Sequence, residues 1–343
     1  MANPVVLLVH GMGTHKEGDI TRDFVAGVNE AAANFGLQNY DISKKIQIEE
    51  YNYSEFIDHI REMLSQASED VRSFSLLSAN GIESSVVNKL LEFENNLTKD
   101  EMLYTHWLDV ILYGATHFGE PIRVGLARKL NQLFKDTHPR DVHIICHSLG
   151  TAVVHDTLVK IYRSDADIKD EVPDFKPGEF NLKTLWTFAN VSRLVYILND
   201  IANPKDSIVH SGTGGCADRF YNIRHEFDPF TWFKTYDRQM THGKTIETKI
   251  IRILNTHDFK EYVTDPHVAK SLIAKLDFDQ DLITDEQLDT AIEKHKKNSF
   301  TADYNVLRDA IKGLKATDSD SFIKVFEAAN KLKSKIKELD NNF

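Results

Sequence analysis

Hydrophobic residues follow two alternating patterns along the chain. Short runs of β-branched residues and leucine are followed by longer stretches in which apolar residues recur every three or four positions, which is typical of amphipathic helices. The first short run is VVLLV at residues 5–9, bounded by Pro4 and Gly11, and it predicts a buried strand. The stretch after it predicts a helix whose apolar face contains Phe24, Val25, Val28 and Ala31.

Five more short runs predict strands further along the chain. They are IQIEEY from residue 46, VHIIC from 142, LKTLWTF from 182, DRFYNIRHE from 218 and IETKIIRIL from 246. Helical patterns occur between them, such as LGTAVVHDTLVKIY at residues 149–162. Since parallel strands need crossover connections, this alternation predicts an α/β fold with a mostly parallel sheet flanked by helices.

Two regions contain helical patterns without strands. Residues 54–136 carry four amphipathic segments, too many for one crossover, so we predict a helical insertion over about 54–120. After Leu276, Thr284 and Gln287 match a capping box, and a long apolar stripe follows at helical spacing. We therefore predict one domain over residues 1–275 and a helical C-terminal extension over 276–343. The stripe consists of Phe322, Val325, Phe326, Ala329, Leu332, Ile336 and Leu339.

Composition excludes several classes of function. The formal net charge of −11 argues against binding a nucleic-acid backbone, which requires clustered Lys and Arg. The N-terminus lacks the basic region of a signal peptide, and no apolar window is long enough for a transmembrane helix. Cys146 and Cys216 belong to no CxxC pair, and no histidine–carboxylate motif indicates a metal. We expect a cytoplasmic protein without a bound metal.

Candidate chemistry centres on Ser148 in the sequence CHSLG, between a predicted strand and a predicted helix. This context resembles the G-x-S-x-G nucleophile elbow of α/β-hydrolases, with Cys146 in place of the first glycine and Gly150 as the second. Small residues are needed at both positions because the turn is tight. The alternative is a serine that caps the following helix.

The second motif is LLVHGMGTH at the end of the first strand. Its segment from His10 through Gly11 to Gly13 resembles the H-G-x-G oxyanion loop of lipases and esterases, although strand–helix turns in other α/β proteins also contain glycine. With both motifs in order, the chain resembles a serine hydrolase of the α/β-hydrolase superfamily over about residues 4–275. By that resemblance, the amides of Met12 and Leu149 stabilise the oxyanion.

In this superfamily the acid and the histidine follow the serine, in that order. Asp228 lies just after a predicted strand, Glu226 is a nearby alternative, and Asp218 precedes the same strand and so lies at the wrong end. His257 directly follows the last predicted strand, which favours it as the base, whereas His267 lies in the next helix and is the alternative.

The resemblance implies that Ser148 attacks an acyl carbon, His257 takes the proton and Asp228 orients His257. An acyl-enzyme would then be hydrolysed, without a cofactor. We expect a carboxylic ester substrate with an apolar, lipid-like acyl chain. Two sets of apolar residues could line a lid or an acyl pocket, or could simply be core: Phe74, Leu76 and Leu77 in the insertion, and Phe230, Trp232 and Phe233 after the proposed acid.

Two other functions stay open at this point. An acyltransferase would use the same three side chains but exclude water from the acyl-enzyme. A non-catalytic relative would act as a binding or scaffold module. The C-terminal helices could dock a partner or form a homo-oligomer, or could pack on their own domain.

Overall fold

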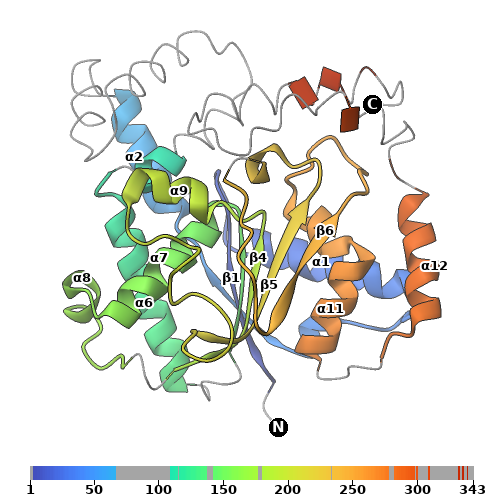
Figure 1. Ribbon diagram of the computed structural model, residues 1–343, viewed down its shortest axis with the longest axis horizontal. Coiled ribbons are helices and arrows are strands. Elements are labelled where there is room, and N and C mark those ends of the chain that lie inside the picture. Colours follow the sequence, from blue (N-terminus) through green and yellow to red (C-terminus); the bar gives the residue numbers. More distant parts are fainter. Residues whose placement is uncertain are drawn as a thin grey trace.

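Six strands in the described part of the chain form one parallel sheet in this computed structural model (Figure 1). The structure describes residues 3–66, 109–114, 116–136, 142–176, 180–232, 234–277, 282–297, 299, 308–309, 331–332, 334–335 and 338. Across the sheet the strands are β2 (Gln47–Tyr51), β1 (Val5–Val9), β3 (Val142–His147), β4 (Leu182–Phe188), β5 (Ala217–His225) and β6 (Gly243–Thr248). The predicted α/β fold with a parallel sheet is confirmed.

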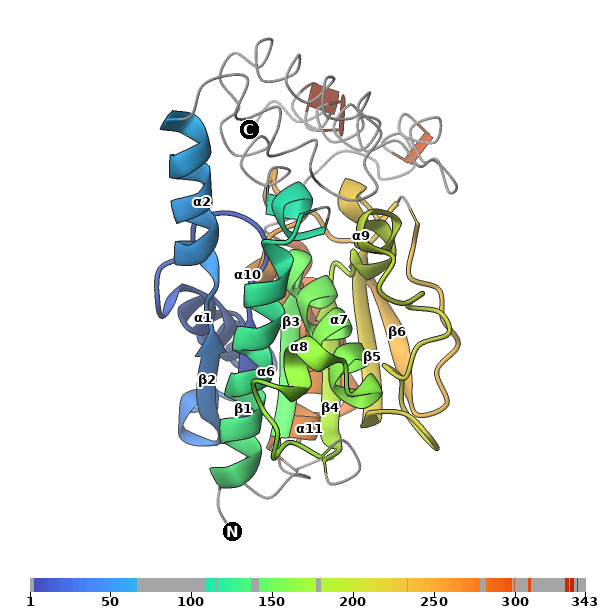
Figure 2. The same ribbon diagram turned by 90° about the vertical axis from the view of Figure 1, so that its left-hand side faces the viewer.

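Helices cover both faces of the sheet, as Figures 1 and 2 show from two directions. One face carries α6 (Gly119–Asp136), α7 (Leu149–Arg163), α8 (Ala166–Lys169) and α9 (Ser192–Asn199). The other carries α1 (Asp19–Asn34), α10 (Phe259–Thr264), α11 (Pro266–Leu276) and α12 (Asp285–Lys296). The helix α2 (Ser54–Gln66) follows β2, and short 3-10 turns lie at Ile42–Lys44 and Pro229–Thr231.

The central strands are buried on both faces, which explains their continuous apolar sequences. In β1, Val5, Leu7 and Val9 join the core on the α6–α7 side. Val6 and Leu8 point the other way, into the core under α1 and α11. The same core contains Trp186 of β4, whose ring stacks on Tyr221 of β5 with centroids 3.9 Å apart.

The last strand begins and ends earlier than the sequence predicted. We expected a strand over residues 246–254, whereas β6 spans Gly243–Thr248. Gly243 allows the early start, because a Cβ there would lie 1.7 Å from the carbonyl oxygen of Phe220. Beyond Thr248 the chain leaves the sheet, and Arg252 bonds to Glu30 and Glu261 instead of continuing the ladder.

Parts of the two predicted helical additions are described. In the insertion, α2 buries Ile57 and Ile60, and residues 109–114 are helical. Most of the other expected helical segments before α6 lie outside the described residues. In the C-terminal region the predicted capping box is present at the start of α12. Of the predicted apolar stripe, Leu332 is described and is buried in the core on the α6–α7 side, while Phe322, Val325, Phe326, Ala329, Ile336 and Leu339 lie outside the description.

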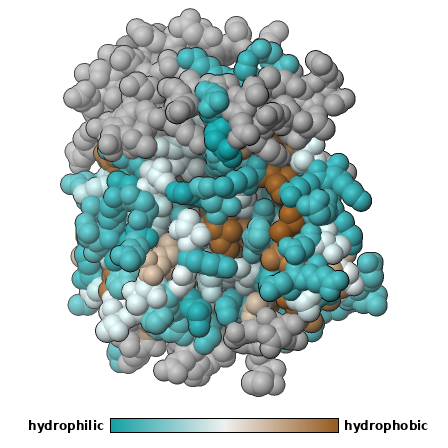
Figure 3. Space-filling view, turned by 45° about the vertical axis from the view of Figure 1, so that its right-hand side comes forward, coloured by the Kyte–Doolittle hydropathy of each residue, from teal (hydrophilic) through white to brown (hydrophobic). Residues whose placement is uncertain are grey.

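The face of the molecule in Figure 3 is predominantly hydrophilic where the described residues form it. On the face in Figure 3, hydrophobic residues reach the surface in a few places between hydrophilic ones. Within the described ranges, no helix combines the length and the apolar character needed to cross a membrane.

The burial of Trp186 provides a test of the core. Trp186→Ala should lower the free energy of unfolding by about 3–5 kcal/mol, because it removes a fully buried ring and leaves a cavity. Ile197→Ala on α9, where the side chain is 37% exposed, should change it by less than about 1 kcal/mol. Urea unfolding monitored by circular dichroism measures both, and equal losses would contradict this account of the core.

Candidate active site

Ser148 forms the whole turn between β3 and α7, in a conformation that non-glycine residues rarely adopt. Its backbone has φ 52° and ψ −126°, which costs on the order of 1–3 kcal/mol. Neighbouring bonds hold the turn: the Ser148 amide donates to Phe188 O at 2.9 Å, and the Thr151 hydroxyl donates to Ser148 O at 2.7 Å. The Ser148 side chain makes no capping bond to α7, so interpreting it as a helix cap is wrong.

Two glycines let the loop after β1 pack directly against this turn. A Cβ on Gly150 would lie 2.3 Å from the carbonyl oxygen of His10, and a Cβ on Gly11 would lie 2.7 Å from Cβ of Ser148. Either side chain would therefore push the two segments apart. Cys146 occupies the position of the first motif glycine, where it is fully buried and its thiol donates to Trp186 O at 3.3 Å.

The His10 side chain braces the loop from inside the protein. Its Nδ1 donates to Gly11 O at 2.7 Å, and its Nε2 accepts from the Tyr53 amide at 3.1 Å. The two rings stack with centroids 4.1 Å apart, and the Tyr53 hydroxyl donates to Gly11 O at 2.9 Å. Burial lowers the pKa of His10 to about 3, so this imidazole is neutral. Its role is to hold the loop in place.

Gly13 anchors the other end of the loop. Its amide donates to Asp109 Oδ2 at 2.7 Å, and its carbonyl accepts from the Ser54 hydroxyl at 3.1 Å. Burial raises the pKa of Asp109 to about 6, while the nearby Arg61 guanidinium opposes that rise. The loop that carries Met12 is therefore fixed by bonds to two other segments of the chain, one with Tyr53 and Ser54 and one with Asp109.

The amides of Met12 and Leu149 have no acceptor among the described residues. Leu149 is the first residue of α7, where backbone amides lack a partner within the helix. Met12 lies between the two braced glycines. Two amide donors in segments packed against Ser148 are suited to binding an oxygen that becomes negatively charged.

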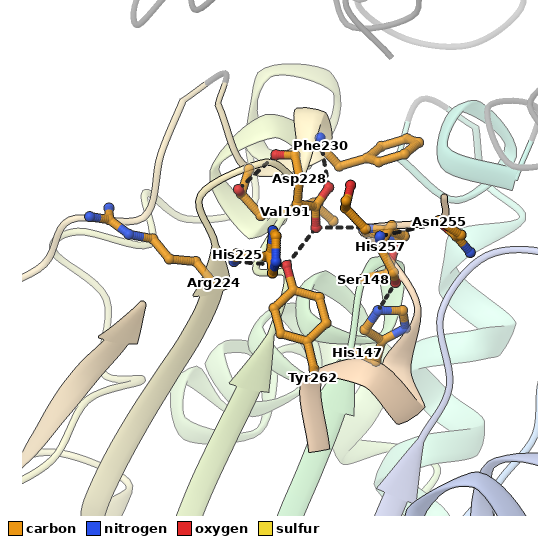
Figure 4. Close-up of polar contacts among 12 residues, drawn as sticks. His147, Ser148, Val191, Arg224, His225, Asp228, Phe230, Asn255, His257 and Tyr262 are labelled. Carbon is orange, nitrogen blue, oxygen red and sulfur yellow. Dashed lines mark hydrogen bonds and ion pairs between the residues drawn. The ribbon is translucent and has the colours of Figure 1, made fainter. Parts of the chain in front are cut away.

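Ser148, His257 and Asp228 form a continuous chain of hydrogen bonds (Figure 4). His257 Nε2 lies 2.8 Å from Ser148 Oγ, and His257 Nδ1 lies 2.7 Å from Asp228 Oδ2. Ser148 follows β3, Asp228 follows β5, and His257 lies between β6 and α10. The parallel sheet thus brings together residues that are far apart in sequence, at the edge formed by the carboxyl ends of its strands.

Further bonds hold the segment around His257. The His147 Nε2 donates to the carbonyl of His257 at 2.9 Å, and the two rings have centroids 4.8 Å apart. The Thr256 hydroxyl donates to Phe227 O at 2.6 Å, which ties this segment to the one that carries Asp228. Asn255 Oδ1 accepts from the His257 amide at 3.2 Å.

This geometry defines the proton positions. An ionised carboxylate only accepts hydrogen bonds, so His257 Nδ1 carries the proton that faces Asp228. In the neutral imidazole, Nε2 is then the acceptor that faces the Ser148 hydroxyl. The arrangement can remove a proton from Ser148 when its oxygen forms a new bond.

The alternative acid and base residues lie elsewhere. His267 is exposed near the start of α11. Glu226 pairs with Arg308, with Oε2 accepting from Nη2 at 2.9 Å. Asp218 lies at the amino end of β5, where it pairs with Lys183 at 3.5 Å. Of the residues considered from the sequence, His257 and Asp228 are the ones that the structure brings to Ser148.

Two residues of the site were not assigned a role from the sequence. His147 directly precedes Ser148 in the sequence, and in the structure it donates to the carbonyl of His257. Tyr262 on α10 donates from its hydroxyl to Asp228 Oδ2 at 2.7 Å. No motif indicates this contact, although the short distance in sequence from His257 to Tyr262 places both near the start of one helix.

A second serine–histidine–aspartate group lies on the α7 side of the sheet. His155 Nδ1 is 2.9 Å from Asp156 Oδ1, and His155 Nε2 is 2.9 Å from Ser207 Oγ. Ser207 lies in a connection without the strand–turn–helix geometry, and its backbone has no positive φ. Asp156 also accepts from Tyr113 at 2.9 Å and Asn199 at 2.7 Å, so this group cross-links buried segments.

Comparisons with known proteins add no assignment. No protein-family model matches the chain, and no curated protein sequence matches it. Within the residues that the structure describes, no group of three or more His, Cys, Asp and Glu side chains is arranged to hold a metal ion.

The close approach at Gly150 can be tested with one added methyl group. Gly150→Ala should lower the free energy of unfolding by about 1–3 kcal/mol, because its Cβ would overlap backbone atoms that cannot rotate away. Gly214→Ala is the control, since its Cβ would contact no atom within 4 Å and only the cost of its φ of 77°, about 1 kcal/mol, remains. If Gly150→Ala were no more destabilising than Gly214→Ala in urea unfolding, the tight contact would be excluded.

Asp109 predicts a pH dependence of stability. Its folded pKa of about 6 lies above its ordinary value of 3.8, so between these values the native state binds more protons than the unfolded state. The stability that Asp109 contributes to the folded protein is therefore fully present below about pH 4 and is lost as the pH rises through 6. From pH 4 to 7, wild type should lose about 1–3 kcal/mol of unfolding free energy relative to Asp109→Asn. A difference between the two proteins that is constant with pH would refute this.

Proposed function

We propose that the protein is a serine hydrolase of the α/β-hydrolase superfamily that cleaves carboxylic esters. The observation that carries this proposal is the 2.8 Å contact between His257 Nε2 and Ser148 Oγ, at a strained turn between a strand and a helix. Asp228 behind His257 completes a hydrogen-bonded set of nucleophile, base and orienting acid.

In the proposed mechanism, Ser148 Oγ attacks the acyl carbon while His257 Nε2 takes its proton. The carbonyl oxygen becomes an oxyanion that accepts hydrogen bonds from the amides of Met12 and Leu149. Buried Asp228 stabilises the imidazolium that forms. As the intermediate collapses, His257 returns the proton to the departing alcohol, which leaves an acyl-enzyme. A water molecule then loses a proton to His257 and attacks the acyl carbon. As the bond between the acyl carbon and Ser148 Oγ breaks, His257 returns that proton to Oγ, and the free acid leaves.

The wider architecture is compatible with this assignment. We propose that the helical insertion over about 54–120 and the extension over 276–343 are additions to a hydrolase domain over residues 1–275. Two contacts support packing of the extension on that domain. Leu332 is buried in the core, and Arg308 pairs with Glu226, two residues before the proposed acid.

An apolar acyl chain is the substrate class that we propose. The Phe230 ring lies beside the His257 ring, with centroids 4.4 Å apart. Phe230 and Trp232 are both buried. We interpret Trp232 as a residue of the hydrophobic core, whereas the Phe230 ring contacts the proposed base. The other candidates for an acyl pocket or lid, Phe74, Leu76, Leu77 and Phe233, lie outside the described residues.

An acyltransferase remains a candidate because it would use the same three side chains. Product analysis with an added alcohol separates the two activities: a hydrolase releases the free acid, whereas a transferase gives the new ester. A binding module would require none of the alignment at Ser148, and it would leave activated esters intact.

A series of p-nitrophenyl esters from acetate to dodecanoate tests the proposed function. Wild type should hydrolyse them with kcat/KM that rises with chain length, since a longer chain buries more apolar surface. Ser148→Ala should reduce kcat by at least about 1,000-fold, because the nucleophile is lost.

Ser207→Ala is the matched control, because it removes a serine that also bonds to a histidine. It should retain wild-type activity. Hydrolysis that survives Ser148→Ala but disappears in Ser207→Ala would overturn the assignment, and equal rates for all chain lengths would exclude only the lipid-like substrate.

A further inference from the structure

Asp228 carries its charge in an unusual setting. Its side chain is fully buried, and no Lys or Arg in the described part of the chain lies within ion-pair distance. Three hydrogen-bond donors surround the carboxylate instead. Oδ1 accepts from the Phe230 amide at 3.0 Å, and Oδ2 accepts from His257 Nδ1 and from the Tyr262 hydroxyl, each at 2.7 Å. A buried charge without a cationic partner depends on such donors.

The direction of the Tyr262 hydrogen bond follows from its other partner. The backbone amide of His225 lies 3.0 Å from the Tyr262 oxygen and can only donate, so that oxygen accepts from it. The single phenolic proton must then point at Asp228. Burial and the adjacent Asp228 raise the pKa of Tyr262 well above its ordinary value, which keeps that proton in place. Figure 4 shows the hydroxyl between His225 and Asp228.

We propose that Tyr262 is a positioning residue that fixes Asp228 against His257 and draws part of the carboxylate charge away from the imidazole. This inference rests on the proposed function, because it assigns Tyr262 a role in tuning the base. Tyr262 and His257 share one short segment, since α10 begins two residues after His257. The phenol and the base are therefore carried by the same segment of the chain.

The sign of the effect follows from electrostatics. A donor to the carboxylate disperses its negative charge, which weakens the attraction between Asp228 and protonated His257. Without the phenolic proton, Asp228 would hold the imidazolium more strongly, and the pKa of His257 would rise. Tyr262 thus limits how strongly Asp228 stabilises the imidazolium.

Other titratable groups near His257 do not replace this contact. The His147 ring packs beside it and donates to its carbonyl oxygen, and the Asp258 carboxylate caps α10 through the Glu261 amide. His225 accepts from the Phe227 amide at Nδ1 and donates to Ile250 O at Nε2, and burial lowers its pKa. Glu226 is paired with Arg308. Tyr262, in contrast, bonds directly to the Asp228 carboxylate.

The second serine–histidine–aspartate group provides a matched control. Tyr113 is also fully buried, and its hydroxyl donates to Asp156 at 2.9 Å, next to His155. Tyr113→Phe therefore removes the same kind of buried tyrosine–aspartate bond, but away from Ser148. Any general loss of stability should be similar in the two variants, whereas a change in His257 should occur in only one.

The first experiment measures the pKa of His257 by NMR in wild type, Tyr262→Phe and Tyr113→Phe. Tyr262→Phe should raise this pKa by about half a unit to one unit, the size expected when one hydrogen bond to a charged group is lost. Tyr113→Phe should leave it unchanged. Replacing Tyr262 with a fluorinated tyrosine, which donates more strongly, should lower the pKa of His257. An unchanged pKa in a folded Tyr262→Phe or fluorotyrosine protein would overturn the proposal.

Kinetics separate this inference from the proposed function. In Tyr262→Phe, the acidic limb of the pH profile of kcat/KM should move to higher pH, and kcat/KM should fall by about 10-fold, part of what a general base contributes. A shifted pKa in a protein without esterase activity would leave Tyr262 coupled to His257 but refute the hydrolase. Ser148-dependent hydrolysis with an unshifted profile would refute the role of Tyr262 alone.

Discussion

The close packing of the His10–Gly13 loop against the Ser148 turn is the constraint on which the rest of the site depends. Ser148 adopts a costly backbone conformation, and the fold holds it there between the Phe188 carbonyl and the Thr151 hydroxyl. Glycine at positions 11 and 150 leaves no atoms between the turn and the carbonyl of His10. The Ser148 side chain makes no bond to the helix it precedes, and the contact brings near it the amides of Met12 and Leu149, which have no acceptor among the described residues.

Hydrogen bonding alone does not distinguish the proposed active site from its structural counterpart. Ser207, His155 and Asp156 are connected by bonds of similar length, and each of the two groups includes a buried tyrosine that donates to its aspartate. What differs is the backbone. Ser148 lies at a strained turn at the carboxyl edge of the sheet, beside a braced glycine loop, whereas Ser207 lies in an ordinary connection. We therefore propose that Ser148 is the reactive serine, because its backbone geometry differs from that of Ser207 although the side-chain bonds are similar.

The sequence predicts the parts of this structure that depend on local patterns. The strands β1 and β3 could be identified because burial on both faces requires continuous apolar runs, and Ser148 could be identified because its turn requires small neighbours. The end of β6 could not be predicted from the sequence. The residues IIRIL continue a strand-like pattern, but the chain leaves the sheet there and Arg252 binds Glu30 and Glu261. Tyr262 was missed for a related reason: its contact with Asp228 joins two segments that no local pattern connects.

Labelling with a fluorophosphonate probe tests the central claim most directly, because the probe reacts with an activated serine whatever the natural substrate is. Peptide mass spectrometry then locates the modified residue. The account predicts modification of Ser148, its loss in His257→Ala, and no modification of Ser207. A folded protein that is not labelled at Ser148, or that is labelled there equally well without the His257 imidazole, would contradict it.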